Sequence, residues 1–301
     1  MTDARLDEGA PVPDLAAGSS WATRIGLQIG GLVFTLGLWT VAAAREWVSK
    51  RILPTPLEVV RSFWTLLSDG ILFDHLGVTL WEVLAGFVLG SAGGFLIAVA
   101  GSVWAPFRRV IYPYMIALQV TPRIAIAPLL FIWLGFGTLP KIVLAATICF
   151  FPVLINTLTG LTLVDEDADE LFRSLGATRR QRFFRLALPG ALPIIMAGLK
   201  TAVSLALIGA IVGEFVSAEK GLGLLIQRFS FQLNTSAAYA VLLTLTAIGL
   251  MLYGLMELID RWVVFWHRDE RLVKRSKRAA VRHARISRAA LGDDSETTQS
   301  Q

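Results

Sequence analysis

Long runs of apolar residues dominate the chain, and most polar residues lie in the segments between these runs. Six runs are long enough for a helix that crosses a hydrocarbon core of roughly 30 Å, which needs about 20 apolar residues. They cover residues 25–44, 83–104, 114–134, 142–164, 192–216 and 237–259. The pattern predicts an all-α integral membrane protein with six transmembrane helices, in a membrane domain of residues 23–265.

The composition agrees with this pattern and limits what else the chain can hold. Hydrophobic residues make up 54% of the sequence and charged residues 17%, and the mean hydropathy is +0.61. So few polar residues cannot solvate a soluble fold of 301 residues. We expect residues 1–22 and 266–301 to be disordered cytoplasmic tails, the second basic and then acidic. No remaining stretch is long enough for a soluble catalytic domain.

The distribution of basic residues predicts how the helices are oriented. With the N-terminus in the cytoplasm, the inner segments hold nineteen Lys and Arg residues and the outer segments hold seven. The positive-inside rule selects this orientation, which places both termini in the cytoplasm. Topology and contact with the lipid bilayer then explain the net charge of +5, and we expect no nucleic-acid partner.

The sequence lacks the patterns of an enzyme or a metal site. His75, His267 and His283 fall outside the predicted spans, and residues 198–201 lack the adjacent Gly and Lys of a phosphate-binding loop. Cys149 is the only cysteine and lies in an apolar run, so we expect it to be a packing residue. We therefore expect no catalytic residue, metal or cofactor on this chain.

Three glycines in the second run are spaced to lie on one face of a helix. Gly86, Gly90 and Gly94 recur at intervals of four residues, which would let another backbone come close. Glycine is also common in membrane helices, so chance is the alternative explanation. After the first run, residues 57–67 have apolar positions at helical spacing and predict a short amphipathic helix on the outer membrane surface.

Four polar side chains inside the predicted spans are candidates for a translocation path: Arg123, Asn156, Lys200 and Glu214. A charge at this depth costs about 2.5 to 3.5 kcal/mol on insertion scales, so it needs a partner or water. Pro122 predicts a helix break beside Arg123, as is tolerated where backbone lines a cavity. Alternatively, Lys200 extends to water and Asn156 bonds a neighbouring helix, while Glu214 is either a solvated mouth residue or a partner for a cation.

The connection between the fourth and fifth runs, residues 165–189, is longer than two membrane helices require and lies on the predicted inner face. Acidic residues at its start favour a helix N-terminus, and Gly176 is suited to end that helix. A second short helix over 177–188 mixes arginines with aromatic residues, and we expect Pro189 and Pro193 to end it. Apolar side chains on a projecting hairpin require a protein partner or the lipid interface.

This hairpin resembles the EAA loop of binding-protein-dependent ABC importer permeases. The family pattern is Glu-Ala-Ala, three residues, Gly, nine residues, Ile, one residue and Leu-Pro. Here Leu171 and Phe172 replace the alanines and Leu186 replaces the isoleucine, so the positions stay apolar. In the family this loop forms coupling helices that insert into a cleft of the ATP-hydrolysing subunit. The resemblance implies this contact for Glu170, Leu171, Phe172, Gly176, Ala177, Arg179, Phe183, Leu186, Leu188 and Pro189.

The resemblance extends over roughly residues 53–265 and implies a bundle like that of type I ABC importer permeases. Segments 53–56, 119–123, 127–129, 133–137 and 213–215 are similar to the branch that takes up nitrate, sulfonates, taurine and thiamine or riboflavin precursors. Within that branch, residues 122–128 most resemble permeases for pyrimidine or flavin-type compounds. Glu82 is a departure, because many relatives carry Arg there.

The resemblance implies a non-catalytic permease subunit of the cell (inner) membrane that forms the path for a small organic solute of the pyrimidine, flavin, sulfonate or nitrate-like kind. An external solute-binding protein would deliver the solute, a second copy of the chain would complete the pore, and two cytoplasmic ABC ATPase subunits would bind ATP and Mg. The alternative is a secondary transporter or channel without an ATPase partner, which would predict more intramembrane carboxylates or paired repeats.

Overall fold

The computed structural model describes residues 21–45, 47–49, 52–217 and 219–266, and every regular element in these ranges is a helix. Five helices are long and apolar enough to cross a membrane: α1 (Trp21–Ala44), α3 (Ile71–Val103), α6 (Leu139–Thr162), α9 (Leu188–Val216) and α11 (Thr235–Val263). The shorter ones are α2 (Pro56–Ser68), α4 (Ala105–Val120), η1 (Arg123–Ile126), α5 (Ala127–Leu134), α7 (Glu166–Ser174), α8 (Arg179–Arg182), η2 (Phe183–Ala187) and α10 (Leu222–Phe231). The all-α membrane fold is confirmed. The two predicted tails lie almost entirely outside the described residues.

The third apolar run does not form one helix, which corrects the count of six continuous spans. α4 ends at Val120. The next two residues, Thr121 and Pro122, have extended backbone conformations, and helical structure begins again with η1 and α5. A residue that precedes a proline is disfavoured in the helical region, and the proline itself cannot donate a helix hydrogen bond. The helix break expected at Pro122 is therefore present, and two short helices replace the third span.

α3 begins twelve residues before the predicted start of its span. Its 33 residues give a length of about 50 Å, which exceeds the hydrocarbon thickness. Its first turns carry Asp74 and His75, so His75 belongs to this long helix rather than to a loop between spans. The extra length leaves these polar turns free to reach beyond the apolar layer.

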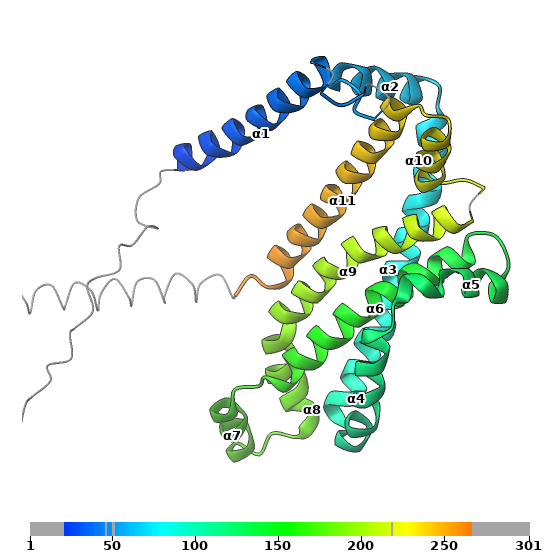
Figure 1. The fold of residues 1–301 in the computed structure, drawn as a ribbon. Coiled ribbons are helices and arrows are strands. Elements are labelled where there is room, and N and C mark those ends of the chain that lie inside the picture. Colours follow the sequence, from blue (N-terminus) through cyan, green and yellow to red (C-terminus); the bar gives the residue numbers. More distant parts are fainter. Residues whose placement is uncertain (1–20, 46, 50–51, 218, 267–301) are drawn as a thin grey trace, which may run out of the picture.

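α6 lies between α3 and α9 and packs extensively against both (Figure 1). The glycine row of α3 faces it. A Cβ atom added at Gly86 would lie 2.5 Å from the Cβ of Ala145, and one at Gly94 would lie 2.6 Å from a carbonyl oxygen of α6. A Cβ atom at Gly90 would collide with the Ala146 carbonyl. These positions let the two backbones approach more closely than any larger residue allows.

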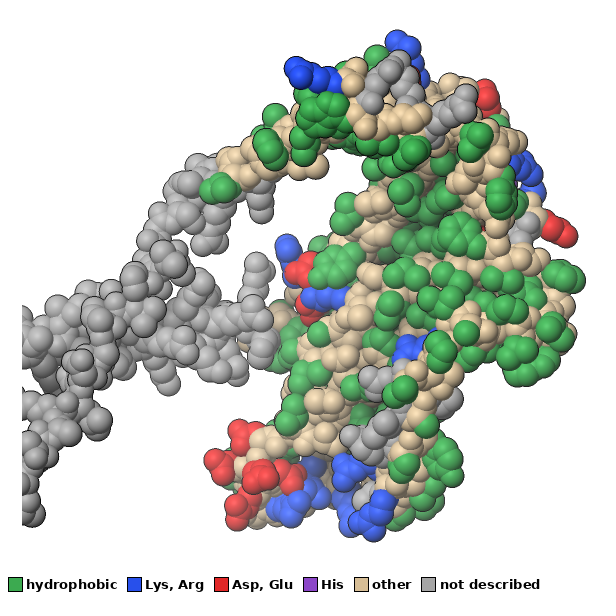
Figure 2. All heavy atoms as spheres, viewed as in Figure 1, with side chains coloured by type: hydrophobic (Ala, Val, Ile, Leu, Met, Phe, Trp, Pro, Cys, Tyr) green, Lys and Arg blue, Asp and Glu red, His purple; other side chains and the backbone are tan. Residues whose placement is uncertain are grey.

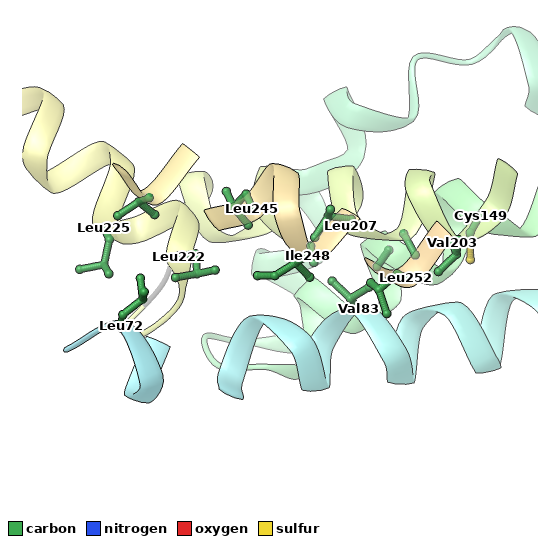
Figure 3. Close-up of a cluster of buried hydrophobic side chains, with 14 of the residues drawn as sticks. Leu72, Val83, Cys149, Val203, Leu207, Leu222, Leu225, Leu245, Ile248 and Leu252 are labelled. Atoms are coloured by element: carbon green, nitrogen blue, oxygen red, sulfur yellow. The ribbon is translucent and has the colours of Figure 1, made fainter. Parts of the chain in front are cut away.

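The main apolar core joins α3, α9, α10 and α11, with α2 and α6 at its edges. Figure 3 shows Leu72 and Leu222 close to Leu225 at one end of this cluster, and Val203 near Cys149 at the other. Cys149 is a free thiol with no exposed surface. It therefore serves as a packing residue, as its apolar surroundings in the sequence predict.

The first two helices stand apart from this core. α1 leans away from the bundle in Figure 1, and nearly all of its described side chains are exposed. α2 forms over the residues predicted for the amphipathic helix and packs Val59 and Leu66 into the protein. Of the four apolar positions at helical spacing, Leu67 packs against the core, whereas three remain exposed: Leu57, Val60 and Trp64. α2 therefore has apolar residues on two faces.

The two ends of the bundle differ in composition. α2 and α10 lie at one end and α7 and α8 at the other (Figure 1). Figure 2 shows acidic side chains gathered over α7, with basic side chains beside them. The charged end belongs to the hairpin of residues 165–189, here called the coupling hairpin.

Candidate functional site

The first helix of the coupling hairpin is fixed at both ends by its own residues. The Asp165 side chain accepts a hydrogen bond from the Asp167 N–H at 3.1 Å, which satisfies one free donor at the start of α7. Gly176 adopts a φ of +74°, and the Ala177 N–H donates to the Phe172 carbonyl at 2.9 Å. This left-handed end is the C-cap that the sequence predicts for Gly176.

A salt-bridge cluster ties the two short helices of the hairpin together. Arg182 Nη1 lies 2.7 Å from Oδ1 and 2.9 Å from Oδ2 of Asp169, and Arg173 Nη2 lies 2.7 Å from Oδ2. The hydrogen bond from Arg182 holds the pKa of the Asp169 carboxyl below its ordinary value. The Thr178 hydroxyl accepts from the Gln181 N–H and so starts α8. The Asp169–Arg182 pair has no unambiguous signal in the sequence, because five arginines lie nearby along the chain.

The second helix does not end at Pro189 and Pro193, contrary to the prediction. α8 continues through η2, a single wide turn in which the Leu188 N–H donates to the Phe183 carbonyl, and then directly into α9. A π-type turn shifts the hydrogen-bond register by one residue, which accommodates prolines that cannot donate. The second helix of the hairpin is thereby continuous with a spanning helix.

The hairpin presents apolar side chains to its surroundings. Leu171 is 58% exposed, Leu175 is 76% exposed and Phe184 is 54% exposed. Phe183 and Leu188 instead pack against a small core of α6 and α9. Of the other residues predicted for docking, Glu170, Gly176 and Arg179 are exposed, whereas Phe172, Ala177, Leu186 and Pro189 are half-buried. Leu175 and Phe184 are not among the predicted contact residues, although each is a large apolar residue in a largely polar segment.

A groove beside α7 is the polar part of this surface. Its volume is about 730 Å³, and it is lined by Thr162, Val164, Glu166, Asp169, Glu170, Arg173 and Ser174. Three of these residues are carboxylates, which corresponds to the acidic side chains seen over α7 in Figure 2. The hairpin therefore combines an acidic groove with exposed apolar side chains, a combination suited to a protein partner.

Arg123 and Asn156 both contact the α6 segment around Pro152. Arg123 Nη1 donates to the Ile148 carbonyl at 3.3 Å, and its guanidinium carbon lies 4.3 Å from the centre of the Phe151 ring. Pro152 cannot donate to Ile148, so Arg123 supplies the hydrogen bond that the proline removes. Asn156 Nδ2 donates to the Pro152 carbonyl at 2.8 Å, which is a bond within its own helix rather than to a neighbour.

Lys200 makes an ion-pair cluster between α9 and α11. Its Nζ lies 2.6 Å from Glu257 Oε2 and 2.6 Å from Asp260 Oδ2. Arg261 adds a weaker contact to Glu257 at 3.5 Å. The ammonium group thus has two carboxylate partners within the protomer, and it does not require water to satisfy its charge.

Glu214 is fully buried near the start of α10. The Thr79 hydroxyl donates to its Oε1 at 2.6 Å and the Gly223 N–H donates to its Oε2 at 2.5 Å. A Cβ atom at Gly221 would collide with this carboxylate, so glycine is needed for the chain to pass. Because Glu214 has no exposed surface in the protomer, the structure disagrees with a solvated mouth residue.

Glu82, the departure from the family pattern, is paired with Lys141. Lys141 Nζ lies 2.5 Å from Glu82 Oε1, and both side chains are almost completely buried. Glu214 and Lys141 also interact electrostatically, so Glu82, Lys141, Glu214 and Thr79 form one group, here called the buried carboxylate cluster. The sequence did not predict this cluster, because Glu82 and Lys141 each lie at the edge of a different apolar run and no local pattern pairs them.

The described residues contain no group of three or more His, Cys, Asp or Glu side chains that could hold a metal ion. The buried carboxylates of α3 and α9 contact other groups of the chain instead: Glu82 pairs with Lys141, and Glu214 accepts hydrogen bonds from a hydroxyl and a backbone N–H. The coupling hairpin, with its exposed apolar side chains and acidic groove, is the candidate site for binding a partner.

Comparison with known proteins shows that this chain is similar to membrane permeases of transport systems. The family model described as "Binding-protein-dependent transport system inner membrane component" matches residues 90–265. The formylaminopyrimidine transport permease protein of Halalkalibacterium halodurans is 32% identical over 77% of this chain and 92% of its own length. The riboflavin transport system permease protein of Chloroflexus aurantiacus is 34% identical over 78% of this chain and 88% of its own length.

Solved structures share the fold. The inward-facing MetNI methionine ABC transporter matches with a TM-score of 0.52 and 22% identity, over 70% of this chain and 98% of the matched chain. An amino acid ABC transporter matches with a TM-score of 0.53 and 20% identity, over 67% of this chain and 97% of the matched chain. With its apolar spanning helices, the chain belongs to the family of binding-protein-dependent transport system inner membrane components, the permease subunits of ABC importers.

Proposed function

We propose that the coupling hairpin docks this permease onto a separate cytoplasmic ATPase, and that ATP binding and hydrolysis there drive solute through the membrane domain. Two copies of the chain form the path, two ATPases bind beneath it, and an external binding protein delivers the solute. Both termini lie in the cytoplasm, as the distribution of basic residues favours. The observation that carries the proposal is the exposed hairpin of residues 165–189, whose second helix continues into α9.

Three features of the hairpin indicate that it docks onto a partner and does not simply connect two helices. Leu171, Leu175 and Phe184 are exposed although they are large and apolar, which is unfavourable in water unless a partner covers them. The salt bridge between Asp169 and Arg182 holds α7 against α8, so little ordering is needed when a partner binds. The continuous path through η2 into α9 lets a displacement of the hairpin reach a spanning helix.

The alternative of a secondary transporter is disfavoured by the state of the intramembrane carboxylates. Ion- or proton-coupled carriers use ionisable groups that face a substrate or ion pathway. In the described part of the chain, Glu82 is paired with Lys141, Glu214 is fully hydrogen-bonded, and Glu257 and Asp260 bind Lys200. None of these groups is left to couple an ion gradient to transport.

The solute is a small organic compound. Relatives named as permeases for formylaminopyrimidine, riboflavin, aliphatic sulfonates and taurine support this range, and we propose a solute of the pyrimidine, flavin, sulfonate or nitrate-like kind. Because an external protein selects the solute before it reaches the membrane, the permease need contribute only part of the specificity.

Copurification tests the docking role. Leu171→Asp places a charge on the exposed apolar surface of the hairpin, and we expect the ATPase encoded with this permease to be lost from the purified complex. Phe231→Asp is the matched control, because Phe231 is 81% exposed but lies in α10 at the opposite end of the molecule. Retention of the ATPase by Leu171→Asp, Leu175→Asp and Phe184→Asp alike would refute the proposal, as would uptake without any ATPase.

A further inference from the structure

Arg123 differs from the other charged residues deep in the membrane domain because it has no acidic partner. The half-buried or buried charges of α3, α6, α9 and α11 form the pairs described above. Arg123 makes one hydrogen bond to a carbonyl and one cation–π contact, and no described carboxylate lies within ion-pair distance of it. A guanidinium group has five N–H donors, so four of them lack a partner among the described residues.

The depth of Arg123 excludes the lipid headgroups as the missing partner. Its guanidinium is hydrogen-bonded to Ile148, which is nine residues from the first residue of α6 and fourteen from the last. At 1.5 Å per residue these separations are about 14 Å and about 21 Å. The group therefore lies well inside the apolar layer, where an isolated charge is strongly unfavourable.

A second copy of the chain is also a poor source of the negative charge. Its described spanning helices carry Glu82, Glu214, Glu257 and Asp260, which are already engaged. The remaining described carboxylate of these helices is Asp74, which lies in the first turn of α3. Among the described residues of the spanning helices, neither copy of the chain therefore offers Arg123 a free carboxylate.

Local structure holds the guanidinium ready for such a partner. One N–H group is fixed by the Ile148 carbonyl that Pro152 leaves free, and one face of the group lies over Phe151. The chain breaks beside it at Thr121 and Pro122, and Thr121, Pro122 and Ile124 are exposed in the protomer. A planar guanidinium with free edges is suited to two parallel hydrogen bonds with an oxyanion.

We propose that Arg123 binds an oxyanion group, a carboxylate, sulfonate or phosphate, of the transported solute as it passes the middle of the membrane domain. This inference rests on the proposed transport function and makes it more specific, because it favours an anionic solute over an uncharged pyrimidine or flavin. Phe151 orients the guanidinium and offers an apolar surface beside it.

A cysteine reporter next to Arg123 tests this site. Ile124→Cys in a Cys149→Ala background gives a chain with one thiol, at a position that is 55% exposed. In nanodiscs that contain the full chain and its ATPase, the labelling rate by neutral N-ethylmaleimide is measured with added benzenesulfonate, benzoate or phenyl phosphate. Uncharged benzenesulfonamide is the matched probe. We expect at least one of the anions to slow labelling and the sulfonamide to have no effect.

Variants at Arg123 show whether the guanidinium is responsible. Arg123→Gln removes one charge-assisted interaction, so we expect the anion concentration needed for protection to rise roughly tenfold to a hundredfold. Arg123→Lys keeps the positive charge but loses the paired N–H donors of the guanidinium. The anion concentration needed to protect this variant should therefore lie between those for the parent and for Arg123→Gln. Arg228→Gln, an arginine in α10, is the control and should behave like the parent. Equal protection in Arg123→Gln, equal effects of anions and sulfonamide, or an unreactive thiol would overturn the proposal.

A second readout leaves Arg123 unchanged, so it remains valid if Arg123→Gln does not fold. Anionic 2-sulfonatoethyl and cationic 2-trimethylammonioethyl methanethiosulfonate are compared at Ile124→Cys, relative to their rates with glutathione. We expect the anionic reagent to have the higher relative reaction rate, and a higher relative rate for the cationic reagent would overturn the proposal. Copurification of the ATPase is scored in the same preparations. Its loss would count against the transport function, whereas its retention without anion binding would count against the Arg123 site alone.

Discussion

The buried carboxylate cluster and the coupling hairpin are both rich in charge, but they are built in opposite ways. In the cluster, Glu82, Lys141 and Glu214 have almost no exposed surface, and each finds its partner on another helix of the same chain. In the hairpin, the ion pairs of Asp169 are local, and large apolar side chains such as Leu171 and Leu175 remain uncovered.

This difference indicates that the charges of the buried cluster stabilise the fold, whereas those of the hairpin shape a surface for a partner. A buried pair costs stability when one partner is removed, because the other charge is left without compensation. An exposed pair contributes little to stability, so the value of the Asp169 cluster lies in the shape of the hairpin. We therefore expect changes in the cluster to alter stability and changes in the hairpin to alter assembly.

The largest effect is expected from Lys141→Met. This change leaves the Glu82 carboxylate buried without its cationic partner, and we expect the free energy of unfolding to fall by about 3 to 5 kcal/mol. Denaturation in mixed detergent measures the change. The double variant Glu82→Gln/Lys141→Met should recover most of the loss, because no unpaired charge remains. A single variant as stable as the parent would show that the pair is not a structural element.

A smaller effect is expected at the contact between α3 and α6. Gly90→Ala places a methyl group against the Ala146 carbonyl, and overpacking of this kind costs about 1 to 3 kcal/mol. Gly93→Ala is the matched control, since its methyl group would lie 3.6 Å from the Phe150 ring and alanine favours a helix. Thermal unfolding of both variants should separate them. Equal midpoints would contradict the close approach of the two helices.

The smallest effect is expected from the Asp169 pair. Arg182 lowers the pKa of Asp169, so the stabilising contact is present above the ordinary value of about 3.9 and is lost only as pH falls through the lower folded value. Amide exchange across α7, corrected for its intrinsic pH dependence, should stay protected down to about pH 4 in the parent. Asp169→Asn should lose this protection at every pH. An identical profile in both proteins would argue against the salt bridge.

The sequence was informative where a local rule decides the structure. Apolar runs predicted the spanning helices, Pro122 predicted the break, and Gly176 predicted the left-handed end of α7. Each of these features depends on neighbours in the chain, which the sequence displays directly. The hairpin pattern from Glu170 to Pro189 likewise predicted the family, which the comparisons established.

The features that the sequence did not predict depend on which helices meet. Glu82 and Lys141 are 59 positions apart, and their pairing follows from the packing of α3 on α6 rather than from any local pattern. The continuation of α8 into α9 was missed for a different reason. Two prolines normally stop a helix, and the wide turn at 183–187 that tolerates them has no simple sequence signature.

The central claim is that the coupling hairpin projects from the cytoplasmic face and is covered there by an ATPase. Leu175→Cys in a Cys149→Ala background places the only thiol on its most exposed apolar position. With a membrane-impermeant maleimide, we expect no labelling in intact cells, labelling in permeabilised membranes stripped of the ATPase, and protection once the ATPase is restored. Labelling in intact cells, or no protection by the ATPase, would contradict the account.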